Sequence, residues 1–409
     1  MAIDRLAAVL AKDIARIDGA GTSKRRERVV VDVVPAKGAK GPRLLLEGEG
    51  LRDFIRMNSN GYLGLALDEE VEAAEDEAVR RYGTGPGAVR FISGTWQPHA
   101  ALERRLGDFH GRPAAMIFSS AYAAVMGTLP SLITEETAVI SDELNHNCII
   151  NAMRLARPAE KHIYRHLDMA DLEACLEKAS AACKRAVVVT DGVFSMRGDH
   201  GPLDEIVALA ARFDDRFAEN AIVVADDSHG VGALGPTGRG TEEVTGAMVD
   251  LLVATLGKAV GVNGGYVAGG GTVIDYLRET SPFYIYSNPI TPGEAAAALA
   301  ALDLIDGPRG RALLDHLRAM AARFRDGLLK LGLETIAGEH PIVPLLVRDT
   351  HRTKALVESL FARGVIATAI SYPVVPKGED EIRFQIAADH TASDIDEVLA
   401  HLAELRNGT

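Results

Sequence analysis

One lysine stands where its surroundings favour amine chemistry. Lys258 follows the apolar run 251–254, which predicts a buried strand, and precedes the glycine-rich stretch 261–266, which we expect to continue neither helix nor strand. Desolvation at the end of a buried strand lowers the pKa of a lysine and frees the neutral amine. A neutral amine is the nucleophile that forms a Schiff base with an aldehyde. The segment therefore makes Lys258 a candidate catalytic residue, although most strand-end lysines simply reach solvent.

Polar residues follow four other apolar runs that read as strands. These are Ser119 to Tyr122 after 115–118, Asp142 to His146 after 138–141, Asp191 to Ser195 after 186–190, and Asp226 to Gly230 after 222–225. In open α/β sheets, ligands bind beyond the carboxyl ends of the strands. We therefore expect hydroxyls, histidines, carboxylates and the Lys258 amine to meet at one edge of a parallel sheet.

This set of side chains suits a pyridine aldehyde phosphate. Such a ring acts as an electron sink when a carboxylate keeps its nitrogen protonated, and Asp226 is the best candidate for that carboxylate. The neighbouring Asp227 is better explained as a cap or turn residue. His229 could bond the phenolic oxygen of the ring, and His146 could stack on the ring, although either histidine could be structural.

A phosphate group would need backbone amides at the start of a helix. Ser120, Ala121 and Tyr122 lead into a predicted helix at 123–129, and Thr255 offers a hydroxyl. A serine in that position can also be an ordinary N-cap. Two rival phosphate motifs fail: Leu252 and Ala259 occupy positions that a Walker P-loop requires as Gly and Ser or Thr, and the glycine run 83–87 follows a helix.

Composition limits the classes of protein to consider. The 409 residues can form more than one domain, and 44 basic against 57 acidic side chains give a net charge of −13 with no basic stripe. This argues against nucleic acid or an anionic membrane as a partner. Three cysteines without metal-ligand spacing predict a reduced, cytoplasmic protein with no metal site. No segment has the length of a membrane span or the core of a signal peptide.

The elements change character along the chain. Between about residues 114 and 270, short apolar runs alternate with helical patterns, which is typical of a parallel sheet. Beyond about residue 290 we expect helices at 291–305, 309–331, 353–363 and 392–406, with strands at 344–347 and 382–386. This predicts three parts: an N-terminal arm and small-domain segment at 1–60, a large domain at 61–290 and a small α+β domain at 291–409. Residues 1–17 form an amphipathic pattern that we expect to pack on the body or on a partner subunit.

Several motifs resemble those of the α-oxoamine synthase family of fold-type I pyridoxal-phosphate (PLP) enzymes over essentially the full chain. They are Asn60 to Ala66, Val89 to Thr95, Asn145-His146, Asp191 to Met196, Asp226 to His229 and Thr255 to Lys258. Segment 372–378 is most similar to the glycine C-acetyltransferases of that family. The resemblance implies an α/β fold with a large domain around a mostly parallel seven-stranded sheet and a small α+β C-terminal domain.

The resemblance also implies a role for each matching residue. Lys258 would carry the cofactor as a Schiff base and transfer protons, and it would form the catalytic group with His146, Asp226 and His229. Ser195 would lie near the cofactor oxygen, and the Ala121 and Tyr122 amides and Thr255 near its phosphate. Ser287 and Asn288 would reach the phosphate in a neighbouring subunit of a homodimer with shared sites. Arg383, flanked by apolar Ile382 and Phe384, would grip the amino-acid carboxylate with help from Asn60.

The activity implied is a Claisen condensation of an amino acid, with glycine favoured and alanine or serine as alternatives, with an acyl-CoA, with or without decarboxylation. Gly61, Pro86, Trp96 and Arg197 depart from the family pattern, and the first three leave the choice of substrates open. An aminotransferase or a lyase could use the same set of residues. A non-catalytic partner subunit is disfavoured because such subunits typically lose the lysine.

Overall fold

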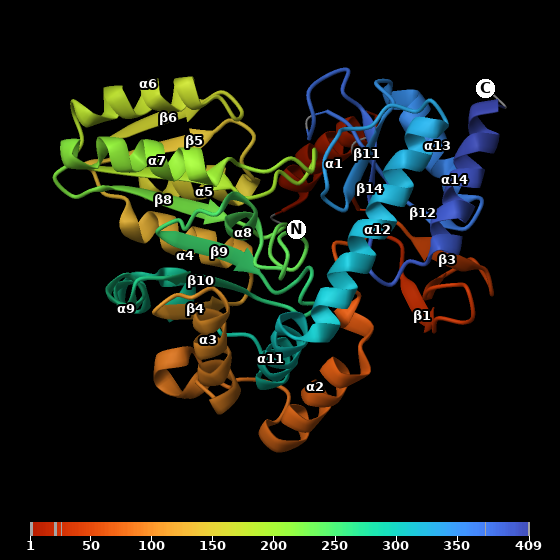
Figure 1. Ribbon diagram of the computed structural model, residues 1–409, viewed down its shortest axis with the longest axis horizontal. Coiled ribbons are helices and arrows are strands. Elements are labelled where there is room, and N and C mark those ends of the chain that lie inside the picture. Colours follow the sequence, from red (N-terminus) through yellow and green to blue (C-terminus); the bar gives the residue numbers. More distant parts are fainter. Residues whose placement is uncertain (1–2, 20–22, 26, 373, 408–409) are drawn as a thin grey trace.

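The computed structural model describes residues 3–19, 23–25, 27–372 and 374–407. Met1 and Ala2 of the predicted N-terminal helix, and Pro373 of the segment 372–378, lie outside the described residues. Figure 1 shows two lobes, with the larger sheet and its helices in one and the C-terminal helices in the other. This arrangement confirms the predicted α/β fold with a smaller C-terminal domain.

A seven-stranded sheet forms the centre of the large lobe. Its strands run in the order β4-β10-β9-β8-β7-β5-β6, and all pairs are parallel except those made by β10. Their bounds are β4 Ala114–Phe118, β5 Thr137–Asp142, β6 Glu160–Tyr164, β7 Arg185–Asp191, β8 Ala221–Asp226, β9 Leu251–Thr255 and β10 Gly265–Gly269. The expectation that residues 261–266 continue neither helix nor strand was wrong at the end of that stretch, because Gly265 and Tyr266 begin strand β10. This strand is buried on both sides, so its pairing with β4 and β9 outweighs the low strand preference of glycine.

Helices cover both faces of this sheet because its strands are apolar on both sides. Val187 and Val189 pack toward one face, with α4 (Ala121–Leu132), α5 (Asn147–Ala156) and α9 (Gly271–Thr280). Ala186 and Val188 pack toward the other face, with α6 (Met169–Ser180) and α7 (Leu203–Phe213). Shorter helices are α8 (Thr241–Thr245) and α10 (Pro282–Ile285). The polar ends of the strands are therefore left as the accessible edge of the sheet.

The smaller lobe contains two further sheets. Strands β11 (Ile342–Leu346), β14 (Glu381–Gln385) and β13 (Thr368–Ile370) form an antiparallel sheet in the order β11-β14-β13. Helices α12 (Pro308–Lys330), α13 (Thr350–Phe361) and α14 (Ala392–Asn407) lie around it in Figure 1. Phe384 of β14 packs edge-on against Phe324 of α12 at 5.0 Å between ring centroids. This packing fixes which face of β14 turns away from the core.

The second small sheet joins distant parts of the chain. Strands β1 (Val30–Val34), β2 (Arg43–Leu46) and β3 (Asp53–Arg56) form a meander, and β3 pairs in parallel with β12 (Val365–Ile366). In Figure 1 the red strands β1 and β3 accordingly lie beside blue β12. The N-terminal strands are therefore built into the same lobe as the C-terminal helices.

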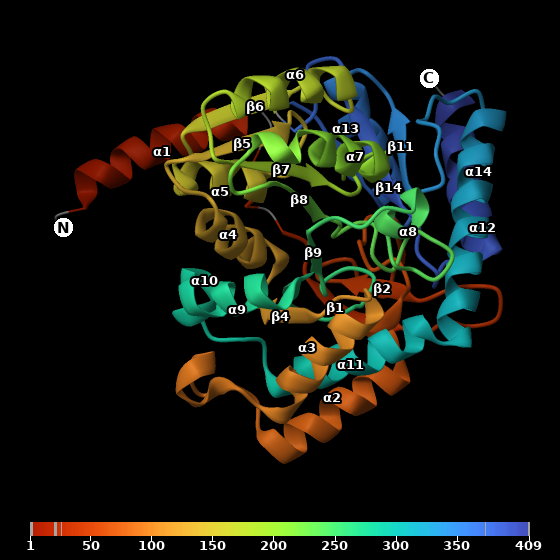
Figure 2. The same cartoon turned by 60° about the vertical axis from the view of Figure 1, so that its left-hand side comes forward.

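In the part of the chain that the structure describes, the N-terminal helix α1 (Asp4–Gly19) buries none of its residues. Figure 2 shows it projecting from the body. Its apolar side chains, Leu6, Val9, Leu10 and Ile14 among them, are about half exposed. Helices α2 (Glu69–Tyr82), α3 (Gln97–Phe109) and α11 (Pro292–Asp306) pack together below the sheet.

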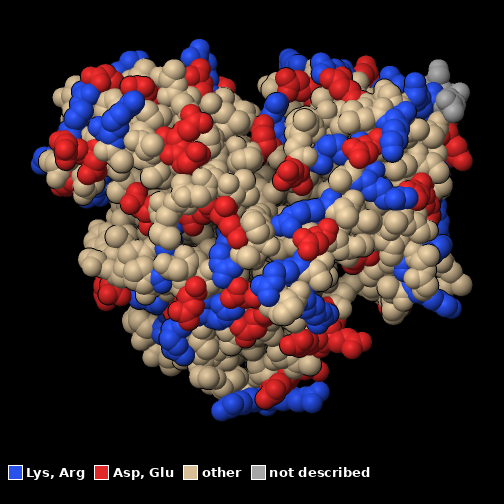
Figure 3. Space-filling model, in the orientation of Figure 1, with Lys and Arg blue, Asp and Glu red and all other residues tan. Residues whose placement is uncertain are grey.

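The surface mixes charges of both signs. On the face in Figure 3, lysine and arginine side chains are interspersed with acidic ones, and the surface is indented between the two lobes. Within the described ranges, every helix is too short or too polar to cross a membrane.

Candidate active site

A cavity of about 260 Å³ lies at the carboxyl ends of the central strands. Lys258 and Asp226 line it, together with the predicted site residues Ala121, Tyr122, His146, Ser195, His229 and Thr255. The predicted residues Asn60, Ser287, Asn288 and Arg383 are not among those that line it. The fold thus brings one expected group of residues together and leaves a second group outside.

Lys258 lies just beyond the end of β9. Burial lowers the pKa of its ammonium to about 8, although the carboxylates of Asp226 and Asp191 act in the opposite direction. In the part of the chain that the structure describes, the ammonium forms no hydrogen bond or ion pair. About a tenth of this amine is therefore neutral at pH 7, far more than for a lysine with the ordinary pKa, and it is unengaged.

Asp226 ends strand β8 directly beside Asp191 at the end of β7. Its Oδ1 accepts hydrogen bonds from the backbone and the hydroxyl of Ser228, and its Oδ2 lies 3.6 Å from Cys148 Sγ. Burial, and the nearby Asp226 carboxylate, raise the pKa of Asp191 well above its usual range. The charged form of Asp191 is therefore disfavoured beside the Asp226 carboxylate.

The Asp227 side chain contacts Thr241 and does not line the cavity, as expected for a structural residue. Its carboxylate accepts hydrogen bonds from the backbone and the hydroxyl of Thr241, each at 2.7 Å. It is fully buried, so these bonds satisfy a group that would otherwise be costly to bury.

His146 caps the start of α5. Its Nδ1 accepts from the Cys148 backbone and lies 2.9 Å from Cys148 Sγ, while its own backbone N–H donates to Asp191 at 3.0 Å. Burial lowers the pKa of its imidazole. The ring is therefore neutral and held by its cap, facing the cavity that also contains Asp226 and Lys258.

His229 is held from behind by two buried side chains. Tyr62 Oη lies 2.7 Å from His229 Nδ1, and His340 Nε2 donates to the His229 carbonyl at 2.9 Å. Burial, with the nearby Lys258 and Arg383 cations, places the pKa of His229 well below its ordinary value. Its neutral ring can therefore exchange a hydrogen bond with a ligand oxygen in the cavity.

The start of α4 offers free backbone donors. Ser120 caps the helix by accepting from Ala123 N at 3.1 Å. Ala121 and Tyr122, as the first two helical residues, have amides without an intrahelical acceptor. A Cβ on Gly265 would lie only 2.1 Å from Ala121 N, so β10 can approach this helix start only because Gly265 has no side chain.

Thr255 lines the same cavity as the start of α4. Its hydroxyl donates to the Gly264 carbonyl at 3.1 Å and accepts from the Gly257 amide at 3.0 Å. Helix amides and a fixed hydroxyl together form an anion site of the kind that binds phosphate.

Arg383 and Asn60 meet outside this cavity. Arg383 Nη2 donates to Asn60 Oδ1 at 3.1 Å, and the buried Nε of Arg383 makes no hydrogen bond. The flanking Ile382 and Phe384 lie in the hydrophobic core, so Arg383 occupies the opposite face of β14. Ser287 is partly buried and Asn288 exposed, away from the cavity of their own chain.

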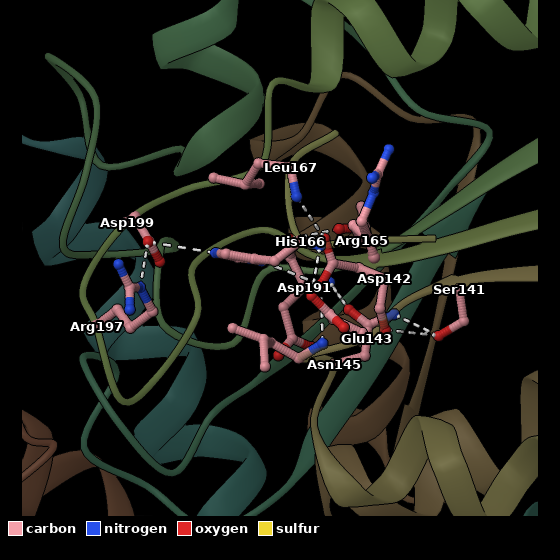
Figure 4. Close-up of polar contacts among 12 residues, drawn as sticks. Ser141, Asp142, Glu143, Asn145, Arg165, His166, Leu167, Asp191, Arg197 and Asp199 are labelled. Carbon is pink, nitrogen blue, oxygen red and sulfur yellow. Dashed lines mark hydrogen bonds and ion pairs between the residues drawn. The ribbon is translucent and has the colours of Figure 1, made fainter. Parts of the chain in front are cut away.

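An ionic network fixes the loops behind the cavity (Figure 4). The His166 ring lies between two carboxylates, with Nδ1 at 3.0 Å from Asp142 and Nε2 at 3.3 Å from Asp199. Arg197 donates to Asp199 at 2.9 Å. These hydrogen bonds overcome the effect of burial and raise the pKa of His166 to about 9. The loop that carries Ser195 is thereby tied to the neighbouring strand ends.

Sequence reasoning missed four residues that support the site. Asp191 and Cys148 contact His146 and lie beside Asp226, and Tyr62 and His340 hold His229. Asp191 stood in a recognised motif without a role, and its place at a strand end was the available signal. Cys148 was considered only as one of three cysteines, and Tyr62 and His340 join the site through contacts far apart in sequence.

The chemistry of the cavity fits PLP. Lys258 provides the amine, Asp226 the carboxylate for the ring nitrogen and His146 an aromatic face, while the Ala121 and Tyr122 amides provide a phosphate site. The Lys258 amine and the first amides of α4 have no hydrogen-bond partner within the described chain, so these groups are available to bind a ligand.

Comparisons with known proteins agree with this geometry. The family model for aminotransferase class I and II matches residues 52–402. Human "2-amino-3-ketobutyrate coenzyme A ligase, mitochondrial" is 40% identical over 409 residues, covering 99% of this chain and 93% of the relative. The 8-amino-7-oxononanoate synthase of Geobacter metallireducens is 39% identical over 400 residues, covering 97% and 98%. The solved structure of S. paucimobilis serine palmitoyltransferase with PLP and myriocin bound has a TM-score of 0.86 and 26% identity, covering 99% and 98%.

Proposed function

Because this chain belongs to the class I and II aminotransferase family, and within it to the PLP-dependent α-oxoamine synthases, we propose that it condenses glycine with an acyl-CoA. Carbon–carbon bond formation releases CoA and gives an α-amino-β-keto acid, or an α-amino ketone if carbon dioxide is then lost. Alanine and serine are the alternative amino acids. The observation that carries the proposal is the unengaged Lys258 amine facing Asp226, His146 and the start of α4 in one cavity.

Each residue has a task in this reaction. When bound, PLP supplies an electron sink for the charge left at the amino-acid Cα after its proton is removed. Asp226 would hold the proton on the ring nitrogen, and the neutral Lys258 amine would take the Cα proton. His229 and Ser195 would hydrogen-bond the phenolic oxygen, and Ala121, Tyr122 and Thr255 would hold the phosphate. The catalytic group is thus Lys258, His146, Asp226 and His229.

Arg383 binds the amino-acid carboxylate in this proposal. A guanidinium matches a carboxylate in shape and charge, and the unpartnered Nε leaves a donor available for it. Asn60, already hydrogen-bonded to Arg383, would fix the orientation of the guanidinium.

We propose a homodimer in which Ser287 and Asn288 reach the phosphate of the partner subunit. Support comes from their position outside their own cavity and from exposed apolar residues: Phe91, Ile92 and Tyr286 are 70%, 67% and 80% exposed. Sedimentation of the holoenzyme should give twice the mass of the chain, and Asn288→Ala should lower the affinity for PLP.

Location and domain bounds also belong to the proposal. Three free cysteines support a cytoplasmic protein, although the human relative is named as mitochondrial. The division near residues 60 and 290 agrees with the change from the seven-stranded sheet to α11 and α12, except that β1 to β3 pair with β12.

A substrate matrix tests the proposed activity. Release of free thiol from acetyl-CoA and longer acyl-CoAs should depend on glycine, alanine or serine. Lys258→Ala should abolish it, whereas Lys161→Ala, which alters an exposed lysine, should not. Borohydride treatment should leave a phosphopyridoxyl group on Lys258. Amino transfer to an oxo acid without thiol release would favour the aminotransferase alternative, and full activity of Lys258→Ala would refute the assignment.

A further inference from the structure

A second cavity, of about 510 Å³, adjoins the first at Ser195, which lines both. Its walls come from the loops after β5, β6 and β7 in the large lobe and from β11, β14 and the loop before β14 in the small lobe. Much of the wall is apolar: Phe194, Met196, Ile336, Leu346, Val374 and Val375. A chamber of this kind next to the reacting centre suits a short carbon chain.

Glu381 is a buried acid in the wall of this cavity. It is only 3% exposed, and its buried Oε1 makes no hydrogen bond. Ile382 lies in the core, so Glu381 shares the opposite face of β14 with Arg383. Burial raises the pKa of the Glu381 carboxyl to about 8, against the influence of Arg383 and Arg197. At neutral pH this group therefore presents both an O–H donor and a carbonyl acceptor.

The other charged groups on the cavity wall already have partners. Arg197 is paired with Asp199 at 2.9 Å and lies 3.9 Å from Glu379. Arg348 pairs with Glu334, His166 lies between two aspartates, and Glu143 accepts from the His166 backbone. Within the described ranges, Glu381 lacks such a partner, and a buried polar group in that state favours a ligand that completes its bonding.

We propose that this cavity receives the acyl group, and that Glu381 selects short acyl-CoAs with an uncharged hydrogen-bonding group, a hydroxyl or keto oxygen, over plain aliphatic ones. The proposal rests on the function proposed above. Residues on one face of a strand are roughly 7 Å apart, the span of two residues. With the amino-acid carboxylate on Arg383, Glu381 would meet the third or fourth carbon of the acyl chain.

The test compares butyryl-CoA with 3-hydroxybutyryl-CoA and 4-hydroxybutyryl-CoA at a fixed glycine concentration. For the wild-type holoenzyme, kcat/KM for one of the hydroxyacyl substrates should exceed that for butyryl-CoA by about tenfold or more. Glu381→Leu should remove this preference, because leucine has nearly the same volume and no hydrogen-bonding group. Glu381→Gln should keep most of it, because an amide both donates and accepts.

Controls separate selection from folding. Glu358→Leu replaces an exposed glutamate of α13 and should keep the wild-type preference. Glu381→Met is a second apolar variant in case the leucine variant does not fold, and thermal unfolding identifies such a failure. An equal fall in kcat/KM for all three acyl-CoAs, or an unchanged preference in the folded Leu and Met variants, would overturn the role of Glu381.

Failure of the proposed function would look different. In that case no acyl-CoA would release thiol with any amino acid, even with the wild-type protein. The affinity of the holoenzyme for 4-hydroxybutyryl-CoA and 3-hydroxybutyryl-CoA, measured by calorimetry, then still tests the role of Glu381. Tighter binding to the wild type than to Glu381→Leu supports selection by Glu381, and equal binding overturns it.

Discussion

Replacing the lysine of the candidate site should make the cofactor-free protein more stable. Burial lowers the pKa of Lys258 from 10.5 to about 8, so below pH 8 the folded protein contains a charged group that it disfavours. The difference between those two values corresponds to about 3 kcal/mol. Lys258→Met removes the charge and keeps an unbranched apolar stem. We expect its free energy of unfolding at pH 7 to exceed that of the wild type by at most about 3 kcal/mol.

The pH dependence identifies the cause. Between pH 8 and 10.5 the unfolded wild-type chain binds a proton on Lys258 that the folded chain has released, so wild-type stability rises with pH in this interval. The advantage of Lys258→Met should therefore be complete below pH 8, shrink between pH 8 and 10.5, and vanish above. Titrations of groups far from Lys258 occur in both proteins and cancel in the difference, whereas the pKa values of Asp191, His146 and His229 depend on the Lys258 charge and change with it.

The assay is thermal or urea unfolding of both cofactor-free proteins from pH 6.5 to 11. Lys161→Met is the matched control, since Lys161 is exposed on β6 and its replacement should give a difference that does not vary with pH. A Lys258→Met protein that is less stable than wild type at pH 7, or whose advantage persists above pH 10.5, would refute the reasoning.

Three further outcomes follow from the contacts described above. Asp227→Ala leaves Thr241 without its buried acceptor and should lower the free energy of unfolding by about 3 kcal/mol, while fluorescence titration should find PLP affinity nearly unchanged. His166→Gln should remove a pH-dependent stabilisation of about 3 kcal/mol that is complete below pH 6.5 and lost as pH rises through about 9, so unfolding curves of the two proteins should converge at pH 10. Gly265→Ala places a Cβ against Ala121 N and should weaken PLP binding at least about tenfold by displacing the start of α4, a result that equal affinities would contradict.

The sequence was sufficient to predict which residues at the strand ends form the site. It was insufficient to predict which residues hold them in place. Lys258, Asp226 and Thr255 follow apolar runs whose strands are fixed by local pattern, so their meeting at one edge was predictable. The bonds of Tyr62 and His340 to His229 join residues 167 and 111 positions apart. Such contacts depend on how the lobes pack, which periodicity does not encode.

Strand pairing was likewise predictable from the sequence only in part. The parallel order of β5, β7, β8 and β9 follows from their alternation with helices, whereas the glycines at the start of β10 concealed a strand. The pairing of Ile55 with Val365 had no local signal, because each strand in that sheet is only two to five residues long.

That same sheet has a consequence during synthesis. Strand β3 emerges early from the ribosome, whereas its parallel partner β12 is translated some 300 residues later. Until then, the edge of β3 that pairs with β12 has no hydrogen-bonding partner strand. Through that interval apolar residues such as Phe54 and Leu46, buried in the finished protein, have an incomplete core around them. The nascent chain is therefore most vulnerable to strand-to-strand aggregation at its N-terminal end, and holdase chaperones would be expected to act there, far from the catalytic lysine.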